Sequence, residues 1–218
     1  MNTSAALALL ATLVFSPNVA RATDEAAEYW FNPSLSFDLD DDTGLELETA
    51  QRLRSDSDGR PDTYFARLWL NQDVADNVTL SGALERRIND GGSNETRLIQ
   101  QLSTRHGVVR TRLRLEQRFV ESADDAGLRI RPRIGLALPI ADDKRLQFKT
   151  DAELFFTLRS ISDSGDTGLT GLRTQIGFSY DINSRLSLSA AYLRQQDISD
   201  GGPDAVGHAP ILGMELAL

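Results

Sequence analysis

Hydrophobic and polar residues alternate along most of the chain, most plainly between residues 108 and 119. In this segment the charged residues fall on even positions and the apolar residues on odd ones: Arg110, Arg112, Arg114, Glu116 and Arg118 against Val109, Leu113, Leu115 and Phe119. A β-strand points successive side chains to opposite faces. The pattern therefore predicts a strand with one charged face and one apolar face.

The same alternation recurs in segments separated by turn-forming residues, and it predicts eleven strands. Their ranges are 28–39, 44–54, 63–72, 78–88, 96–105, 108–120, 128–138, 145–159, 170–180, 185–197 and 210–218. Most have the roughly nine to eleven residues that a tilted transmembrane strand needs. The connections between them are alternately short and long, as in bacterial outer-membrane barrels. We therefore predict an all-β fold, a transmembrane antiparallel up-and-down β-barrel of about ten to twelve strands.

The strand number leaves alternatives open, because single-chain bacterial barrels have an even number of strands. Segment 44–218 alone gives ten strands with connections in the expected order. Segment 28–39 would then lie inside the barrel or over its rim, or a twelfth strand would be hidden in a long segment such as 145–159. A soluble β-sandwich is the competing architecture. The length of the strands and the arginine-rich polar face argue against it.

The apolar face includes aromatic residues near strand ends, where they would suit an interfacial girdle: Phe31, Tyr64, Phe119, Tyr180 and Tyr192. The opposite face carries arginines that would line the lumen. We single out Arg110, Arg112, Arg114, Arg118, Arg129, Arg131, Arg133 and Arg173. The arginine guanidinium can bind a carboxylate through two parallel hydrogen bonds in a fixed geometry, so arginine suits a crowded interior.

Two interpretations of this lumen compete. In the first, which we favour, arginines pair with Glu and Asp across strands, fill a narrow barrel and carry no catalysis. In the second, the arginines line a narrow anion-selective channel for small acidic solutes. A third possibility is a lipid-acting enzyme at the barrel rim around His208, which has Ser199, Asp200 and Asp204 nearby in sequence. Its spacing matches no specific motif, so we predict no catalytic residues.

Residues 1–22 have the features of a secretory signal peptide. The apolar run from Ala5 to Phe15 is too short to span a bilayer as a helix, and Ala20-Arg21-Ala22 fits a cleavage site. No Lys or Arg precedes the run, which departs from the usual pattern. We expect residues 23–218 to form the barrel in the bacterial outer membrane. The expected partners are membrane lipid, the barrel-assembly machinery and small anionic solutes.

Composition narrows the possible functions further. The chain has 218 residues, no cysteine and a net charge of −9. It can therefore form no disulfide and use no thiol chemistry, and its acidity argues against nucleic-acid binding. Many acidic residues fall in the connections, as in Asp40-Asp41-Asp42. These segments predict solvated turns, since none has the spacing of a calcium-binding EF-hand loop. We expect no metal and no cofactor.

Several segments, in this order, resemble a known family. They are Tyr29-Trp30, the Leu45–Arg54 strand, Arg110–Phe119, Glu153-Leu154-Phe155-Phe156 and Arg173–Tyr180. The chain is similar along its mature length to the family called domain of unknown function 2490, taken to be bacterial outer-membrane barrels. The resemblance implies a fold and a location but no activity. The chain ends in Leu218, where many outer-membrane barrels end in Phe or Tyr.

Overall fold

The computed structural model describes residues 24–54, 62–140 and 142–218, and within them the chain forms eleven strands. They are β1 (Asp24–Asp38), β2 (Thr43–Arg54), β3 (Thr63–Ala75), β4 (Val78–Asn89), β5 (Glu95–His106), β6 (Val109–Val120), β7 (Gly127–Pro139), β8 (Leu146–Arg159), β9 (Gly168–Asp181), β10 (Leu186–Asp197) and β11 (Ala205–Ala217). Each predicted strand overlaps one of these. The predicted signal peptide lies outside the described residues.

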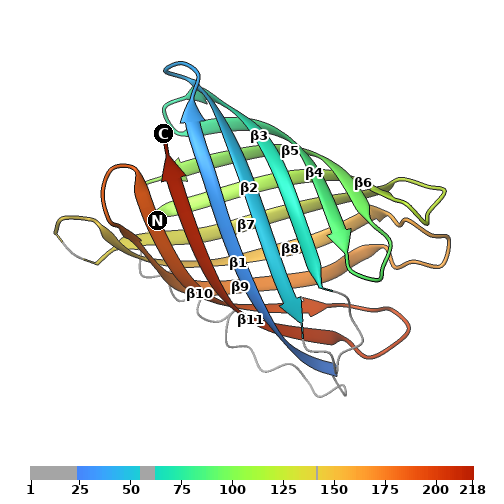
Figure 1. The fold of residues 1–218 in the computed structure, drawn as a ribbon. Coiled ribbons are helices and arrows are strands. Elements are labelled where there is room, and N and C mark those ends of the chain that lie inside the picture. The colour runs from blue at the N-terminus through green and yellow to red at the C-terminus, as the bar shows by residue number, and fades with distance from the viewer. Residues whose placement is uncertain (1–23, 55–61, 141) are drawn as a thin grey trace.

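The strands form one closed barrel in which each consecutive pair is antiparallel (Figure 1). Pairing continues in sequence order from β2 to β11 without a crossover. The prediction of an all-β barrel of ten to twelve strands is confirmed. The alternative of a soluble sandwich with two sheets is wrong, because the strands belong to one closed sheet.

The barrel closes through a parallel pair, β1 with β11, which the sequence did not predict. Trp30 lies opposite Ile211 and Leu35 opposite Leu216, and in Figure 1 the two strands run side by side in the same direction. An odd number of up-and-down strands makes the first and last strands point the same way, so their pairing must be parallel. Segment 28–39 is therefore part of the wall. It lies neither in the lumen nor over the rim, and β8 (Leu146–Arg159) is a single strand.

Most of the short connections lie at one end of the barrel and the longer ones at the other, although the β7–β8 connection at the short end has six residues and the β4–β5 connection at the long end has five. Only Gly107 and Val108 join β5 to β6, and the positive φ of Gly107, 58°, suits the first position of such a tight hairpin loop. The longer connections begin after β2, β4, β6, β8 and β10. Strand β1 starts at the end with the long connections, where Asp24 pairs with Ala205, and β11 finishes at the end with the short turns.

Polar side chains face the inside of the barrel and apolar side chains face the outside, the reverse of the arrangement in a soluble protein. In β6, Arg114 and Glu116 point inward and are 5% and 0% exposed, whereas the outward Leu113 is 50% exposed. Leu68, Leu84, Leu98, Ile134, Phe178, Leu188 and Leu212 are among the other exposed apolar residues. The barrel thus has an apolar outside and a charged inside. Within the described part of the chain, no helix combines the length and the apolar character required to cross a bilayer.

Candidate functional site

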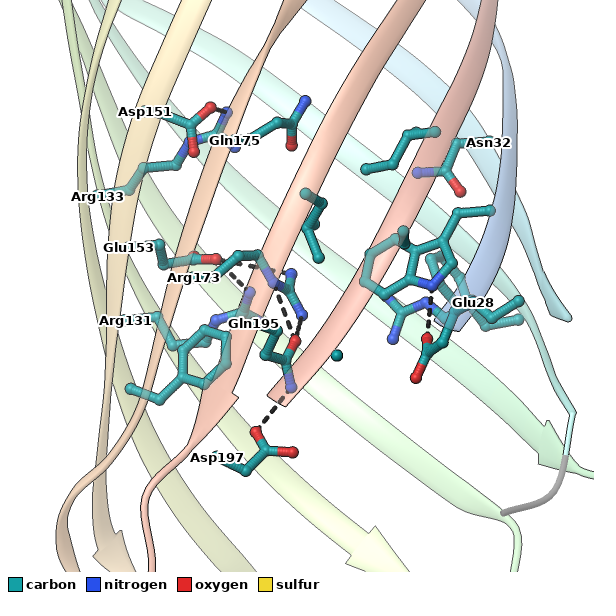
Figure 2. A pocket seen from close by; sticks show the side chains of 18 of the residues that line it. Glu28, Asn32, Arg131, Arg133, Asp151, Glu153, Arg173, Gln175, Gln195 and Asp197 are labelled. Carbon is teal, nitrogen blue, oxygen red and sulfur yellow. Dashed lines mark hydrogen bonds and ion pairs between the residues drawn. The ribbon is translucent and has the colours of Figure 1, made fainter. Parts of the chain in front are cut away.

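A cavity of about 800 Å³ occupies the barrel interior and is lined by residues from all eleven strands. Eleven arginines line it, against five carboxylates. The arginines are Arg52, Arg54, Arg67, Arg87, Arg97, Arg112, Arg114, Arg129, Arg131, Arg133 and Arg173, and the carboxylates are Glu28, Glu48, Asp151, Glu153 and Asp197. Figure 2 shows Arg131, Arg133 and Arg173 grouped with Asp151 and Glu153 on one side, and Glu28 and Asn32 of β1 on the other.

Three carboxylates, each at most 2% exposed, organise the arginines into a network: Glu85, Glu116 and Glu153. Glu116 accepts hydrogen bonds from Arg129 at 2.7 Å and from Arg131 at 2.5 Å. Arg131 also donates to Glu153 at 2.6 Å, so it joins two of the carboxylates. Paired charges of this kind can remain ionised away from water. The network fixes the guanidinium positions in the wall.

A second group of arginines contacts neutral partners. Arg114 donates to the Gln101 side chain at 3.0 and 2.7 Å. Arg173 donates to Gln195 at 3.1 Å and lies 3.7 Å from Glu153. Arg114 also lies 3.8 Å from Glu116, so each of these two arginines has a carboxylate only near the outer limit of ion-pair distance. Even when the buried Glu85, Glu95 and Glu116 are added to the lining carboxylates, arginines outnumber acidic groups around the cavity.

Four aromatic rings lie among the arginines: Trp30, Phe65, Trp69 and Phe155, each at most 5% exposed. The Arg52 guanidinium carbon is 3.9 Å from the Trp30 ring centroid, and the Arg131 carbon is 4.5 Å from that of Phe155. A guanidinium over a ring face is attracted by the ring quadrupole. These rings are not among the residues predicted for the lumen. Their positions in the alternation could have identified them. Trp30 lies two residues from Glu28, and Phe155 lies two residues from Glu153, so each ring points to the same face as the neighbouring carboxylate.

Six of the eight arginines predicted for the lumen line the cavity: Arg112, Arg114, Arg129, Arg131, Arg133 and Arg173. The other two lie nearer the barrel ends. Arg118 donates to Glu95 at 2.5 Å and borders a smaller cavity of about 330 Å³ next to the β10–β11 connection. Arg110 donates to the backbone carbonyls of Gly107 and Val109 at the short β5–β6 turn. Their role on an anion path remains a prediction.

Lumen arginines missing from that prediction come from the first half of the chain. Arg52, Arg54, Arg67, Arg87 and Arg97 all line the cavity. Each has the inward parity of its strand, so the alternation in the sequence places all five on the polar face, although they are not among the eight singled out.

The groups proposed for a rim enzyme are engaged separately. His208 faces outward, and its Nδ1 lies 2.5 Å from the Tyr192 hydroxyl. Asp204 instead accepts hydrogen bonds from the Gln196 side chain at 2.6 Å and from the backbone N–H of Ser199 at 3.3 Å. In residues 24–54, 62–140 and 142–218, no group of three or more His, Asp or Glu is placed to hold a metal ion.

One ion pair outside the lumen offers a contrast to the network. Arg86, on the outer face of β4, donates to Glu121, which follows β6. This hydrogen bond lowers the pKa of the Glu121 carboxyl below its usual range. Both side chains are about half exposed, so solvent screens their attraction.

Comparison with known proteins agrees with the fold. A family model described as "Protein of unknown function (DUF2490)" matches residues 27–206. The solved structure titled "NanC porin structure in rhombohedral crystal form" superimposes with a TM-score of 0.59 at 8% identity, covering 88% of this chain and 98% of that one. At this identity the likeness concerns the fold alone. No curated protein matches the chain.

Proposed function

The chain belongs to the DUF2490 family, and we propose that it is a non-catalytic channel of the bacterial outer membrane that passes small acidic solutes. The exposed apolar outer face is what a barrel surrounded by lipid requires. Exposed Tyr64, Phe119 and Tyr180 lie near strand ends, where aromatic side chains favour the interface, whereas Tyr192 lies in the middle of β10. Such a barrel would reach the membrane by means of the barrel-assembly machinery. A solved porin of the same fold also supports a channel.

The observation that carries the proposal is the excess of arginines around an internal cavity. Barrels of eight strands are filled by side chains, whereas those of 16–18 strands leave a wide aqueous channel. This barrel has eleven strands and retains about 800 Å³ of internal space. Because that space is lined by more than twice as many arginines as carboxylates, its potential favours anions.

A second candidate function is a closed scaffold, in which the arginine–glutamate network has only a structural role. The nearly complete burial of Glu85, Glu116 and Glu153 favours it, because each of these carboxylates binds arginines from neighbouring strands. The two functions differ in one measurable property. The channel carries ions across the barrel, and the scaffold does not.

Single-channel recording of the refolded protein in a planar bilayer tests the proposal, with a salt gradient to measure ion selectivity. We expect discrete, small conductance steps with a preference for anions. The Arg133→Gln variant should shift the reversal potential towards cations, because the Arg133 side chain is 33% exposed and its one ion pair with a described residue is that with Asp151. The change keeps a polar side chain that can form hydrogen bonds, so folding should be retained.

Arg86→Gln is the matched control, since the same substitution is made on the outer face of the barrel. It should leave the selectivity unchanged. A folded, inserted but electrically silent protein would refute the channel and favour the scaffold. Open channels that prefer cations would contradict the role given to the arginines.

A further inference from the structure

An apolar patch interrupts the charged inner wall where the barrel closes. Trp30 of β1, Leu193 of β10, and Ala209 and Ile211 of β11 pack together there, all less than 8% exposed. Trp30 lies opposite Ile211 in the parallel β1–β11 pair, and Leu193 lies opposite Ala209 in the β10–β11 pair. All four residues line the central cavity. A purely ionic lumen would not need such a patch.

An arginine borders the patch on each side. Arg52 is the partner of Trp30 on β2, and Arg173 comes from β9, the strand beyond β10. Their guanidinium carbons lie 3.9 Å and 5.1 Å from the Trp30 ring centroid. Two cations of separate strands thus meet at one aromatic ring.

Arg52 is unusual among the lumen arginines. Among the described residues, no carboxylate lies within ion-pair distance of its guanidinium. Its buried Nε has no hydrogen-bond partner, a feature that it shares with Arg97, Arg112 and Arg131. Arg173 is only partly compensated, since Gln195 is neutral and the Glu153 oxygen is 3.7 Å away. A partly buried guanidinium without a full anionic partner is energetically costly, and a carboxylate is the partner that its geometry fits.

The indole of Trp30 is held in place at this point. Its Nε1 donates to the Glu28 carboxylate at 2.7 Å, and Glu28 in turn accepts a hydrogen bond from Arg54 at 3.0 Å. The negative charge of Glu28 is therefore already paired with Arg54. The ring therefore presents a preorganised apolar surface. Its one polar group, the indole N–H, is already hydrogen-bonded and needs no acceptor from a ligand.

We propose that Arg52, Arg173 and this patch form a binding site for a small carboxylic acid with an apolar body. The carboxylate binds the two guanidinium groups, and the body contacts Trp30, Ile211 and Leu193. This inference rests on the proposed entry of acidic solutes into the lumen and specifies their chemistry. A bare inorganic anion would satisfy the arginines and leave the apolar patch unused.

Trp30 supplies an optical test, because the chain has only two tryptophans. In a Trp69→Phe background, Trp30 emission from the refolded protein is followed while cyclohexanecarboxylate, acetate, inorganic phosphate or the neutral cyclohexanemethanol is added. We expect saturable binding, with cyclohexanecarboxylate at least about tenfold tighter than acetate or phosphate, since each buried CH₂ contributes to affinity. The neutral alcohol should bind weakly, because it lacks the charge.

Arg52→Gln and Arg173→Gln should each weaken cyclohexanecarboxylate binding by about tenfold or more, and Arg86→Gln on the outer face should not. Titration calorimetry on the unmodified protein gives the same comparison if Trp69→Phe impairs folding. Equal affinities for cyclohexanecarboxylate and acetate, or binding unchanged by Arg52→Gln, would overturn the site. Failure of the channel itself would appear differently, as binding of the acid by a protein that conducts no ions.

Discussion

The ring of Phe155 on β8 lies against Gly171, its partner on β9. A Cβ at position 171 would come within 2.6 Å of the ring carbon Cδ2. The glycine therefore leaves the space in which the ring faces the lumen arginines. The guanidinium carbons of Arg129, Arg131 and Arg173 lie 4.5–5.1 Å from its centroid.

Gly171→Ala should lower the free energy of unfolding by about 1–3 kcal/mol, because the added methyl group forces the packed ring to move. Urea unfolding of the refolded protein in detergent micelles measures the change. In a Phe155→Leu background the same substitution should cost less, since the smaller side chain leaves room. Equal costs in both backgrounds would show that the contact with Phe155 is not the cause.

Glu116→Gln tests whether the buried network stabilises the barrel. Glu116 is 0% exposed and holds Arg129 and Arg131. The neutral side chain leaves those charges without a full counter-charge, so the loss should be about 3–5 kcal/mol, measured by the same unfolding assay. Glu121→Gln is the control, because its ion pair with Arg86 is exposed. A negligible effect of Glu116→Gln would show that water replaces the carboxylate in the lumen.

The alternation of residue types was enough to predict the strands and the two faces of the wall, because a period of two is imposed by strand geometry. It also placed Arg131 and Arg133 in the lumen. It could not predict the β1–β11 pairing, since the alternation within Asp24–Asp38 is the same whether the neighbour is parallel or antiparallel. The rule that single-chain bacterial barrels have an even number of strands favoured ten or twelve strands, whereas the barrel closes with eleven.

The apolar patch of the lumen was hidden for a different reason. Trp30, Leu193 and Ile211 have inward parity but apolar side chains. In the sequence the polar residues mark the inner face, so these apolar residues are exceptions to the pattern. Only the closure of the barrel brings β1, β10 and β11 together and shows that the exceptions form one surface.

Leu115→Arg should prevent or strongly impair membrane assembly. Leu115 is an outward residue in the middle of β6, between the inward Arg114 and Glu116. A charge facing lipid near the midplane costs about 2–4 kcal/mol, and the cost falls to about 0–1 kcal/mol near the interface. Val109→Arg, at the first residue of β6 and on the same face, is the matched control. Insertion into vesicles, followed by heat-modifiable gel mobility, gives the readout. Equal tolerance of both substitutions would contradict a surrounding bilayer.

The parallel closure can be tested by cross-linking, because the chain has no cysteine of its own. Leu35 of β1 lies opposite Leu216 of β11, so cysteines at both positions would have Cα atoms within disulfide reach. We expect the Leu35→Cys, Leu216→Cys variant to form an intramolecular disulfide on mild oxidation of the folded protein. Cross-linking should be seen as a mobility shift that reductant reverses.

The control pairs Leu35→Cys with Leu212→Cys. Leu212 is opposite Phe31, four residues away from the register position of Leu35. Four residues along a strand span about 13 Å, which is beyond the reach of a disulfide. This pair should therefore remain reduced under the same conditions. If β2 and β11 closed a ten-stranded barrel instead, β1 would leave the wall, and neither pair would cross-link in preference to the other. A selective disulfide at 35 and 216 is expected only when β1 lies beside β11 in the observed register.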